Sequence, residues 1–387
     1  MKHDWTKGRF SEIFDLQMGK TPSRDNPMYW NGTNAWVSIA DLKGKYIDST
    51  KEGITDTAIA ESGINKVPQG TVIMSFKLTV GRAAITNCDL FTNEAIMSFS
   101  PKKNEILPDF IYYYLKGYKW KGANKAVMGQ TLNKKSISDN IFSYPSLSVQ
   151  EQIVSELDKV SEIIEKKKQQ VKELDNLAQS IFYDMFGDPV ENDKGWRTCS
   201  LGDMCEIGSS KRIFAEEYKE SGVPFFRGKE VSEKSNGMQT SVELFIGQDR
   251  YDEIKKKYGV PKVGDILLTA VGTIGNIWVV DTNEPFYFKD GNVLWLQKKT
   301  QASSTYLKYL LESLIDAYKR SMANGCAYSA LTIMNLKKMP TNITPFALQQ
   351  SFAKKIEAIE KQKELINASI KESQTLFDAR MDYWFGE

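Results

Sequence analysis

Apolar residues in the middle of the chain and at its end recur at alternating spacings of three and four. Lys167 alone interrupts the first stripe, which comprises Leu157, Val160, Ile164, Val171, Leu174, Ala178, Ile181 and Met185. A weaker stripe near the C-terminus comprises Ile356, Ile359, Ile366, Ile370, Phe377 and Trp384, with Lys363, Ser373 and Arg380 between them. Such heptad stripes are typical of coiled coils. They predict two long helices, over 148–187 and 344–387. The alternative is that each helix packs only on its own domain.

The rest of the chain has a different pattern. Short β-branched and aromatic runs, such as Trp36-Val37-Ser38-Ile39 and Ile266-Leu267-Leu268-Thr269, are separated by Gly, Asn, Asp and Pro. This alternation predicts short strands joined by turns. We therefore expect two domains of mixed α/β structure, in the α+β class, at 1–147 and 188–343.

The second half of the chain repeats the first, at an offset that drifts from about 190 to 199 residues. Trp5 returns as Trp196, Thr79-Val80-Gly81 returns as Thr273-Ile274-Gly275, and Leu147-x-x-Gln150-x-x-Ile153 returns as Phe346-x-x-Gln349-x-x-Phe352. A chain that leaves its first domain along one helix and returns along the other predicts an antiparallel pair. With symmetric ends, the numbers of facing residues should add to about 541, so that Leu157 faces Trp384.

Composition limits the chemistry that the chain can perform. The one histidine, His3, leaves almost no material for nucleophilic catalysis or a histidine metal site, and the four cysteines form no Cys-x-x-Cys pair. A glycine-rich phosphate loop and a Phe-x-Gly-x-Gly cofactor loop are both missing from the sequence. We predict a protein that is not an enzyme and that has no catalytic residue, metal site or cofactor.

Charge and hydropathy indicate where the protein acts. The net charge of +2 is low for a protein that grips many phosphates alone, so with a nucleic-acid partner another subunit should supply much of the grip. No apolar run approaches the roughly 18 residues of a membrane span, and the N-terminus has no signal-peptide core. We expect a cytoplasmic protein.

A duplicated, turn-rich unit without catalytic residues, each copy followed by a heptad helix, resembles the specificity subunit of a type I DNA restriction–modification system. The segments that carry the resemblance are Gly19-Lys20-Thr21-Pro22-Ser23, residues 36–42, Val80-Gly81-Arg82 with its twin at 272–276, and residues 147–153. Each motif alone is loose. Their order and double occurrence make the resemblance specific.

The resemblance implies two target-recognition domains that each read one half of a bipartite site in double-stranded DNA. The helices are then an antiparallel spacer on which two methyltransferase subunits dock, and restriction/translocase subunits join this core. Partner subunits would hold S-adenosylmethionine, ATP and Mg²⁺ and would methylate adenine. The alternative is a stand-alone DNA-binding or scaffold protein, spaced by a coiled coil, that has no methyltransferase partner.

Candidate DNA-binding residues lie in turns where glycine lets the backbone approach the duplex, because Arg, Lys, Asn, Gln, Ser and Thr read base edges and hold phosphates. In the first copy they are Lys20, Thr21, Ser23, Arg24, Lys77, Thr79, Arg82, Gln130, Thr131, Asn133 and Lys134. In the second copy they are Ser209, Ser210, Lys211, Arg212, Arg227, Lys229, Thr273, Asn276, Tyr328 and Ser329.

Overall fold

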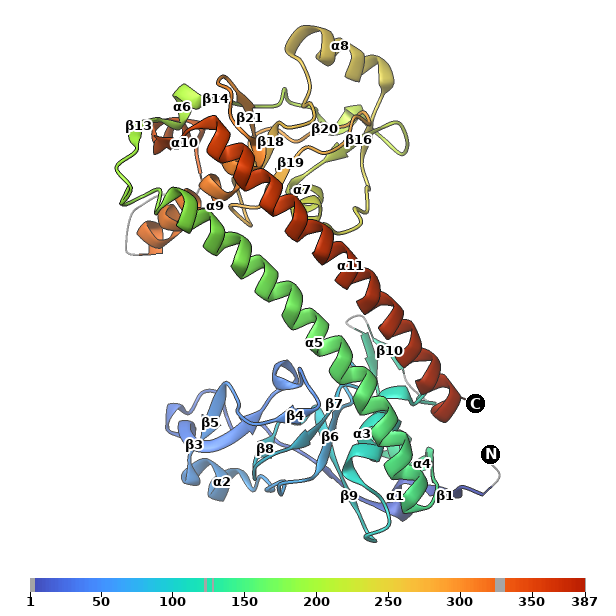
Figure 1. Cartoon of the computed structure of the whole chain (residues 1–387). Coiled ribbons are helices and arrows are strands. Elements are labelled where there is room, and N and C mark those ends of the chain that lie inside the picture. The colour runs from blue at the N-terminus through green and yellow to red at the C-terminus, as the bar shows by residue number, and fades with distance from the viewer. Residues whose placement is uncertain (1–3, 122–123, 127–128, 324–330, 387) are drawn as a thin grey trace. The chain divides into compact units, whose positions relative to one another are not determined.

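The computed structural model describes residues 4–121, 124–126, 129–323 and 331–386. The chain divides into two compact units (Figure 1). Unit 1 comprises Met1–Lys168 and Ala368–Glu387, and unit 2 comprises Gln169–Asn367. Each unit therefore contains one mixed α/β domain and one half of each long helix.

Unit 1 contains a five-stranded sheet of order β2-β9-β6-β7-β4 and a three-stranded sheet of order β5-β3-β8. Its strands are β1 (Thr6–Arg9), β2 (Phe14–Met18), β3 (Trp30–Val37), β4 (Tyr46–Ile47), β5 (Glu52–Ile54), β6 (Val72–Ser75), β7 (Ala83–Thr86), β8 (Phe91–Thr92), β9 (Ile96–Pro101), β10 (Asn124–Ala126), β11 (Gly129–Thr131) and β12 (Ile141–Tyr144). Its short helices are α1 (Phe10–Ile13), α2 (Asp56–Ser62), α3 (Pro108–Gly117) and α4 (Lys134–Asp139).

Unit 2 contains two four-stranded sheets, of order β14-β21-β18-β19 and β15-β17-β16-β20. Its strands are β13 (Arg197–Ser200), β14 (Cys205–Ser209), β15 (Tyr218–Lys219), β16 (Val223–Phe226), β17 (Phe245–Ile246), β18 (Ile266–Thr269), β19 (Ile277–Val279), β20 (Tyr287–Phe288), β21 (Val293–Lys298) and β22 (Pro340–Ile343). Its helices are α6 (Leu201–Met204), α7 (Gly228–Ser235), α8 (Gln248–Tyr258), α9 (Ser304–Ala323) and α10 (Ile333–Lys338).

The central strands β6 and β18 show why these segments form buried sheets. Successive side chains of a strand point to opposite faces. In β6, Val72 and Met74 join the core that includes α3, whereas Ile73 joins a second core on the other face. In β18, Ile266 and Leu268 likewise join one core, and Leu267 joins another core on the opposite face. The predicted α+β class and the internal repeat are both confirmed.

A buried glutamine secures the start of each long helix. The Gln150 side-chain oxygen accepts the Leu107 amide at 2.9 Å, and its amide donates to the carbonyls of Glu105 and Pro145. The Gln349 oxygen likewise accepts the Ser303 amide at 2.9 Å, and its amide donates to the Thr344 carbonyl. The repeated Leu/Phe-x-x-Gln-x-x-Ile/Phe pattern is therefore a structural joint between domain and helix.

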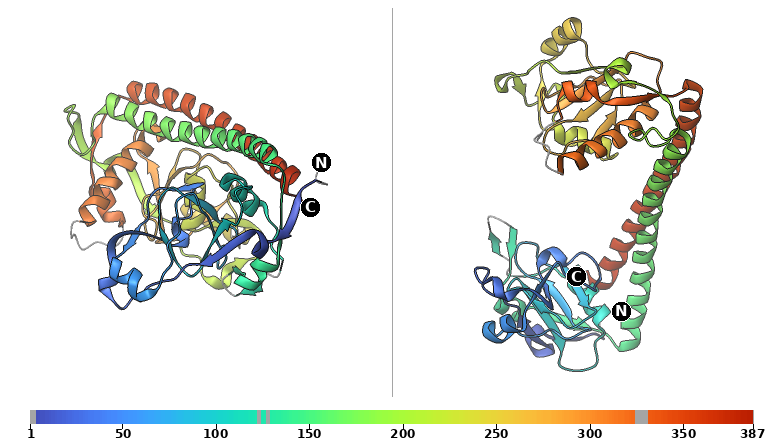
Figure 2. Two further views of the ribbon diagram at one scale, coloured as in Figure 1. Left: turned by 90° about the horizontal axis from the view of Figure 1, so that it is seen from below. Right: turned by 90° about the vertical axis from the view of Figure 1, so that its left-hand side faces the viewer.

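The long helices are α5 (Leu147–Phe186) and α11 (Phe346–Phe385), each of 40 residues. Within each unit their halves lie side by side (Figures 1 and 2). The starts differ from the predicted residues 148 and 344 by one and two positions. The reason is that the Ser146 carbonyl accepts the first backbone amide bonds of α5, and the Pro345 carbonyl accepts those of α11.

Polar contacts establish that the two helices are antiparallel. In unit 1, Glu156 bonds to Arg380 and Trp384, and Lys167 bonds to Ser369 and Ser373. In unit 2, Lys363 pairs with Asp175 at 2.7 Å. The residue numbers of these pairs add to 536, 538 or 540. The predicted antiparallel direction is confirmed, and the sums differ from the predicted 541 by one to five residues, on average less than one helical turn.

The apolar stripe is most deeply buried near the helix ends. Leu157, Val160 and Ile164 share a core with Phe377 in unit 1. In unit 2 the fully buried residues of α5 are the predicted Ala178 together with Phe182 and Phe186, whereas the predicted Ile181 and Met185 are only half-buried. A straight helix drifts from a strict heptad by about 20° per repeat, which brings the neighbouring phenylalanines inward. Phe182 and Phe186 pack on Tyr306 of α9, so the helix end also packs on its own domain.

Candidate nucleic-acid interface

The turn that follows β6 closes on itself through a buried hydroxyl. The Ser75 hydroxyl donates to the Thr79 carbonyl, and the Gly81 amide donates to the Ser75 carbonyl at 3.0 Å. Gly81 has φ +91°, which favours glycine. The side chains of Thr79 and Arg82 are exposed and pair with none of the residues that the structure describes. The turn is thus a fixed support for an available cation.

Unit 2 repeats this turn after β18. The Thr269 hydroxyl donates to the Thr273 carbonyl at 2.5 Å, and the Gly275 amide donates to the Thr269 carbonyl at 2.9 Å. Asn276 occupies the position of Arg82, but its amide donates to the Ser232 hydroxyl of α7 at 2.7 Å. The two copies therefore share the turn and differ in the group that it presents.

A basic hollow lies beside the first turn. Its volume is about 610 Å³, and Lys43, Arg82 and Lys116 line it together with Thr79 and Tyr112. Lys43 and Lys116 were not among the sequence candidates, although Lys43 directly precedes Gly44 and α3 brings Lys116 to the site. Burial lowers the pKa of Lys116 and the charge of Lys168 adds to this effect, although Asp378 opposes it. None of the three cations forms an ion pair with a described residue.

The glycine-containing loop before β3 is tied to its own domain. A Cβ atom on Gly19 would lie 2.1 Å from the Thr92 carbonyl oxygen, so only glycine fits there. Lys20 Nζ donates to the Ser62 carbonyl at 2.5 Å, and the Thr21 hydroxyl donates to the Glu94 carboxylate. Of the candidates in this loop, Ser23 is the one whose side chain is exposed and forms no hydrogen bond with a described residue.

Arg24 in the same loop has two structural contacts. Its guanidinium donates to both oxygens of Glu52, at 2.5 and 3.0 Å, and lies 3.7 Å from the centroid of the Trp30 ring. The hydrogen bond to Glu52 raises the pKa of Arg24 and lowers the pKa of Glu52. A bidentate pair stacked on an aromatic ring is a geometry specific to arginine.

Residues of the counterpart loop in unit 2 also contact their own domain. The Ser209 hydroxyl accepts the Gly291 amide at 3.0 Å, and Ser210 is half-buried. Lys211 Nζ lies 4.5 Å from the Tyr258 ring centroid, and Arg212 pairs with Asp290 at 3.0 Å. The side chains of Lys211 and Arg212 nevertheless remain exposed.

Arg227 and Lys229 form a network with two glutamates. Arg227 donates to Glu230 and Glu243, each at 2.8 Å, and Lys229 donates to Glu243 at 2.8 Å. Lys229 and Arg227 together lower the pKa of Glu243 to about 2. The Glu230 side chain is only 1% exposed. The guanidinium of Arg227 is therefore engaged in neutralising a buried carboxylate.

The remaining candidates are spread over several elements. Lys77 is half-buried beside the Phe76 ring, and Thr131 is half-buried at the end of β11. Asn133 caps α4, where its side-chain oxygen accepts the Ser136 amide at 2.8 Å, and the adjacent Lys134 is exposed. The backbone of Gln130 lies in β11, whereas Tyr328 and Ser329 lie outside the described residues.

Two further structural findings concern metal binding and membrane insertion. In the described ranges, no group of three or more His, Cys, Asp or Glu residues could hold a metal ion. A search of the same ranges finds no helix that is long and apolar enough to cross a membrane.

Comparisons with known proteins agree with the duplicated architecture. Residues 2–174 and 193–373 match the family described as type I restriction modification DNA specificity domain. The chain is 27% identical to the type I restriction enzyme MjaIX specificity subunit of Methanocaldococcus jannaschii, over 59% of this chain and 58% of that one. It is 26% identical to the putative type I restriction enzyme specificity subunit S.HindORF215P of Haemophilus influenzae, over 67% of this chain and 66% of that one. Each match spans less than two thirds of the relative's length.

A solved structure from work on complex assembly and conformational transition of the type I R-M system has a similar fold. The TM-score is 0.59 at 16% identity, and the comparison covers 99% of this chain and 98% of the other. The two domain matches together span most of the 387 residues. The chain therefore belongs to the family of type I restriction modification DNA specificity domains and carries two copies of that domain.

Proposed function

We propose that this chain is the DNA-recognition subunit of a type I restriction–modification complex and acts in the cytoplasm. Its domains at 1–147 and 188–343 each read one half of a bipartite target. The helices, over 148–187 and 344–387, space the two halves. Family membership and the repeated turns after β6 and β18 support this function.

The observation that carries the proposal is the basic hollow around the first turn. Lys43, Arg82 and Lys116 surround it without a paired carboxylate among the described residues. Unpaired cations around a concave surface attract phosphate, and such contacts position a protein on the duplex. Thr79, on the same turn, can donate to a phosphate or to a base edge.

The outer faces of the long helices offer a surface for partner subunits. Ile163 and Leu177 of α5 and Leu365 and Leu376 of α11 are 47%, 48%, 73% and 52% exposed. Apolar side chains in these positions do not pack in the seam and are suited to partner helices. Two methyltransferase subunits would dock here, and restriction/translocase subunits would join them. These partners would hold S-adenosylmethionine, ATP and Mg²⁺.

Salt-dependent DNA binding of the assembled complex tests the hollow. Substitution Arg82→Ala should weaken binding at every sequence and reduce the slope of log affinity against log salt by about one, because one phosphate contact is lost. Lys51→Ala removes an exposed lysine elsewhere in unit 1 and is the matched control. Unchanged affinity and slope in Arg82→Ala would show that the hollow does not hold a phosphate.

Domain exchange tests the assignment of reading to the two domains. Residues 188–343 are replaced by the corresponding segment of a relative with a different target, and the methylated sites of the complex are mapped. One half of the recognised sequence should change while the other half stays. A change in both halves, or in neither, would contradict separate reading by the two domains.

A further inference from the structure

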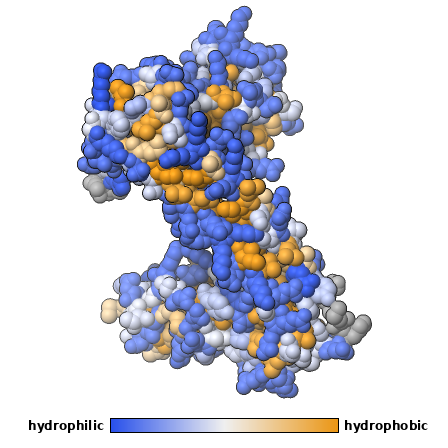
Figure 3. All heavy atoms as spheres, in the orientation of Figure 1, coloured by the Kyte–Doolittle hydropathy of each residue, from blue (hydrophilic) through white to orange (hydrophobic). Residues whose placement is uncertain are grey.

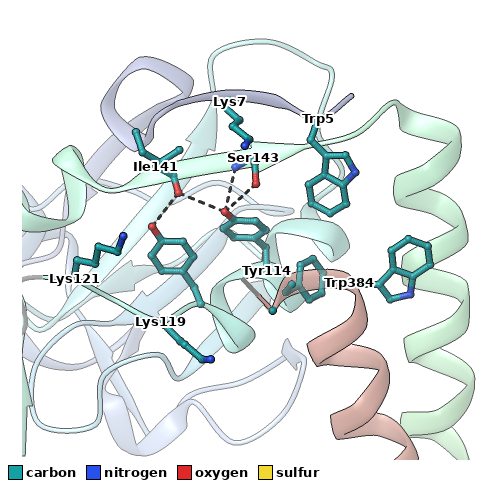
Figure 4. A pocket seen from close by; sticks show the side chains of 11 residues that line it. Trp5, Lys7, Tyr114, Lys119, Lys121, Ile141, Ser143 and Trp384 are labelled. Atoms are coloured by element: carbon teal, nitrogen blue, oxygen red, sulfur yellow. Dashed lines mark hydrogen bonds between the residues drawn. The ribbon is translucent and has the colours of Figure 1, made fainter. Parts of the chain in front are cut away.

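A cavity of about 410 Å³ opens in unit 1 beside the ends of the described chain. Trp5, Lys7 and Ser143 line one side, Trp384 at the end of α11 lines the other, and Tyr114 lies between them (Figure 4). Phe385, the last residue of α11, also lines the cavity. Lys119 and Lys121 complete the rim. All of these residues belong to unit 1.

The internal repeat identifies the same place in unit 2. In β1 and β12, Lys7 pairs with Ser143, and in β13 and β22, Thr198 pairs with Asn342. The helix ends also correspond, because the Gly386 amide donates to Asp382 and the Gly187 amide donates to Tyr183, each at 2.8 Å. Thr198, Asn342, Phe186 and Gly187 are therefore the counterparts of Lys7, Ser143, Phe385 and Gly386.

In unit 2 the chain itself passes through this place as residues 187–195. Pro189 is buried, and its carbonyl accepts a hydrogen bond from the Asn342 side chain at 3.4 Å. The Asp188 carboxylate accepts the Val190 amide at 2.8 Å. Trp196, the counterpart of Trp5, donates to the Phe186 carbonyl at 2.8 Å and closes the turn. Pro189 is thus seated against the strand pair and the helix end, with Asp188 beside it, whereas Val190 is 51% exposed.

The cavity in unit 1 has suitable chemistry for a segment of the same kind. Trp5 and Trp384 are half-buried and present aromatic surface, and grooves lined by aromatic rings hold proline. Lys7, Lys119 and Lys121 are exposed, and their ammonium groups pair with no described residue. No carboxylate side chain lines the cavity among the described residues. The rim therefore attracts an acidic group.

We propose that this cavity is a docking site for a short segment of a partner protein in which an acidic residue precedes a proline, as in Asp188-Pro189. The proposal rests on the repeat and the cavity and does not depend on DNA reading. In unit 2 the covalent connection supplies an effective concentration on the order of millimolar, which a free peptide lacks. A contact that forms at this effective concentration needs a dissociation constant of only about millimolar. We therefore expect a free peptide to bind weakly, at about millimolar concentration.

The test uses the full chain labelled with 5-fluorotryptophan and a nine-residue peptide with the sequence of residues 187–195. The variants Trp5→Phe and Trp384→Phe assign the two cavity resonances. Fluorine NMR should show these resonances shifting with saturation at roughly millimolar peptide. The resonance of Trp36, which is buried in another core cluster, should not shift and reports that the chain is folded.

Matched variants decide whether the cavity is responsible. Lys119→Glu with Lys121→Glu should weaken peptide binding by about tenfold, because the rim charge is reversed. Lys51→Glu with Lys103→Glu reverses two exposed lysines elsewhere in unit 1 and should leave binding unchanged. A peptide with alanine in place of its proline should bind more weakly.

Three results would overturn the proposal. The Trp5 and Trp384 resonances do not respond to the peptide, they respond equally to the alanine peptide, or the charge-reversed chain binds as well as its control. Movement of the same two resonances with chain concentration, in the absence of peptide, would identify a second copy of this chain as the occupant and would also contradict the proposal.

Discussion

The ammonium group of Lys167 donates a hydrogen bond to the Ser373 hydroxyl at 2.9 Å. It also donates to the Ser369 hydroxyl at 2.6 Å. Lys167 interrupts the apolar stripe of α5, and Ser373 interrupts that of α11. The two polar interruptions thus satisfy each other, and a polar pair of this kind specifies the register of a coiled coil at a cost in stability.

Replacing this pair by apolar residues should stabilise unit 1. We expect Lys167→Leu with Ser373→Leu to raise the free energy of unfolding by about 1 kcal/mol, because partly buried polar groups are replaced by packed side chains. Thermal unfolding followed by circular dichroism measures the change. Lys166→Leu alters an exposed neighbour and should have little effect. A double variant less stable than the natural chain would refute this account of the seam.

We expect Arg227 to contribute to the stability of the folded protein, whether or not it contacts DNA. Arg227→Ala leaves the carboxylate of Glu230 buried without its cation, which costs about 3 kcal/mol. Arg212→Ala removes a pair that is 68% exposed on the arginine side and should cost less than about 1 kcal/mol. Denaturant unfolding of both variants makes the comparison. Equal stability of the two variants would mean that Arg227 has no such structural role.

The same pair makes stability depend on pH in acid. Burial alone would raise the pKa of Glu230, but hydrogen bonds from Arg227 outweigh it and lower the pKa. A carboxyl with a lowered folded pKa stabilises the protein above its ordinary value of 4.5, and this contribution is lost as pH falls below that value. The unfolding midpoint should therefore drop less steeply below about pH 4.5 in Glu230→Gln than in Glu220→Gln, an exposed control. Identical acid profiles would contradict this prediction.

The helices should set the gap between the two half-sites. One added heptad after Val171 and one after Asn367 face each other in the observed register and lengthen the helix pair by about 10 Å. This corresponds to roughly three base pairs of duplex. Methylation mapping of the variant complex should show unchanged half-sites and a gap longer by about two to four pairs. Affinity should fall, because three pairs rotate the second half-site by roughly 100°. The same gap at full activity would show that the helices do not set it.

A fragment of residues 1–188 should dimerise through its own helix. The stripe of α5 would replace that of α11, so Ala178 would stand where Phe377 packs beside Leu157 and Ile164. The smaller side chain leaves that contact underfilled, and Ala178→Phe should tighten the dimer by about tenfold. Sedimentation of both fragments at tens of micromolar measures the difference. If both fragments stay monomeric, residues 1–188 do not form a complete unit by dimerising.

Local patterns in the sequence were sufficient to predict the repeat, the fold class, the two helices and their direction. Heptad spacing and strand alternation are patterns among residues close together in the sequence. The folded structure keeps these patterns because each helix or strand must bury one face. The observed register of the two helices is close to the predicted one but shifted from it, and Lys167 bonds to Ser369 as well as to Ser373. Which phenylalanines enter the unit 2 core depended on helix drift and on contacts with α9.

Only the tertiary structure decided which candidate cations are available. Arg24, Arg212 and Arg227 sit in glycine-containing or polar segments like that of Arg82, yet carboxylates 28, 78 and 16 residues away engage them. Lys43, from the loop before β4, and Lys116, from α3, joined Arg82 because the packing of these elements placed them there. A side chain's partner depends on distances between segments that are remote in sequence. The types of residue near one another along the chain therefore indicate where function lies, and folding determines which groups carry it.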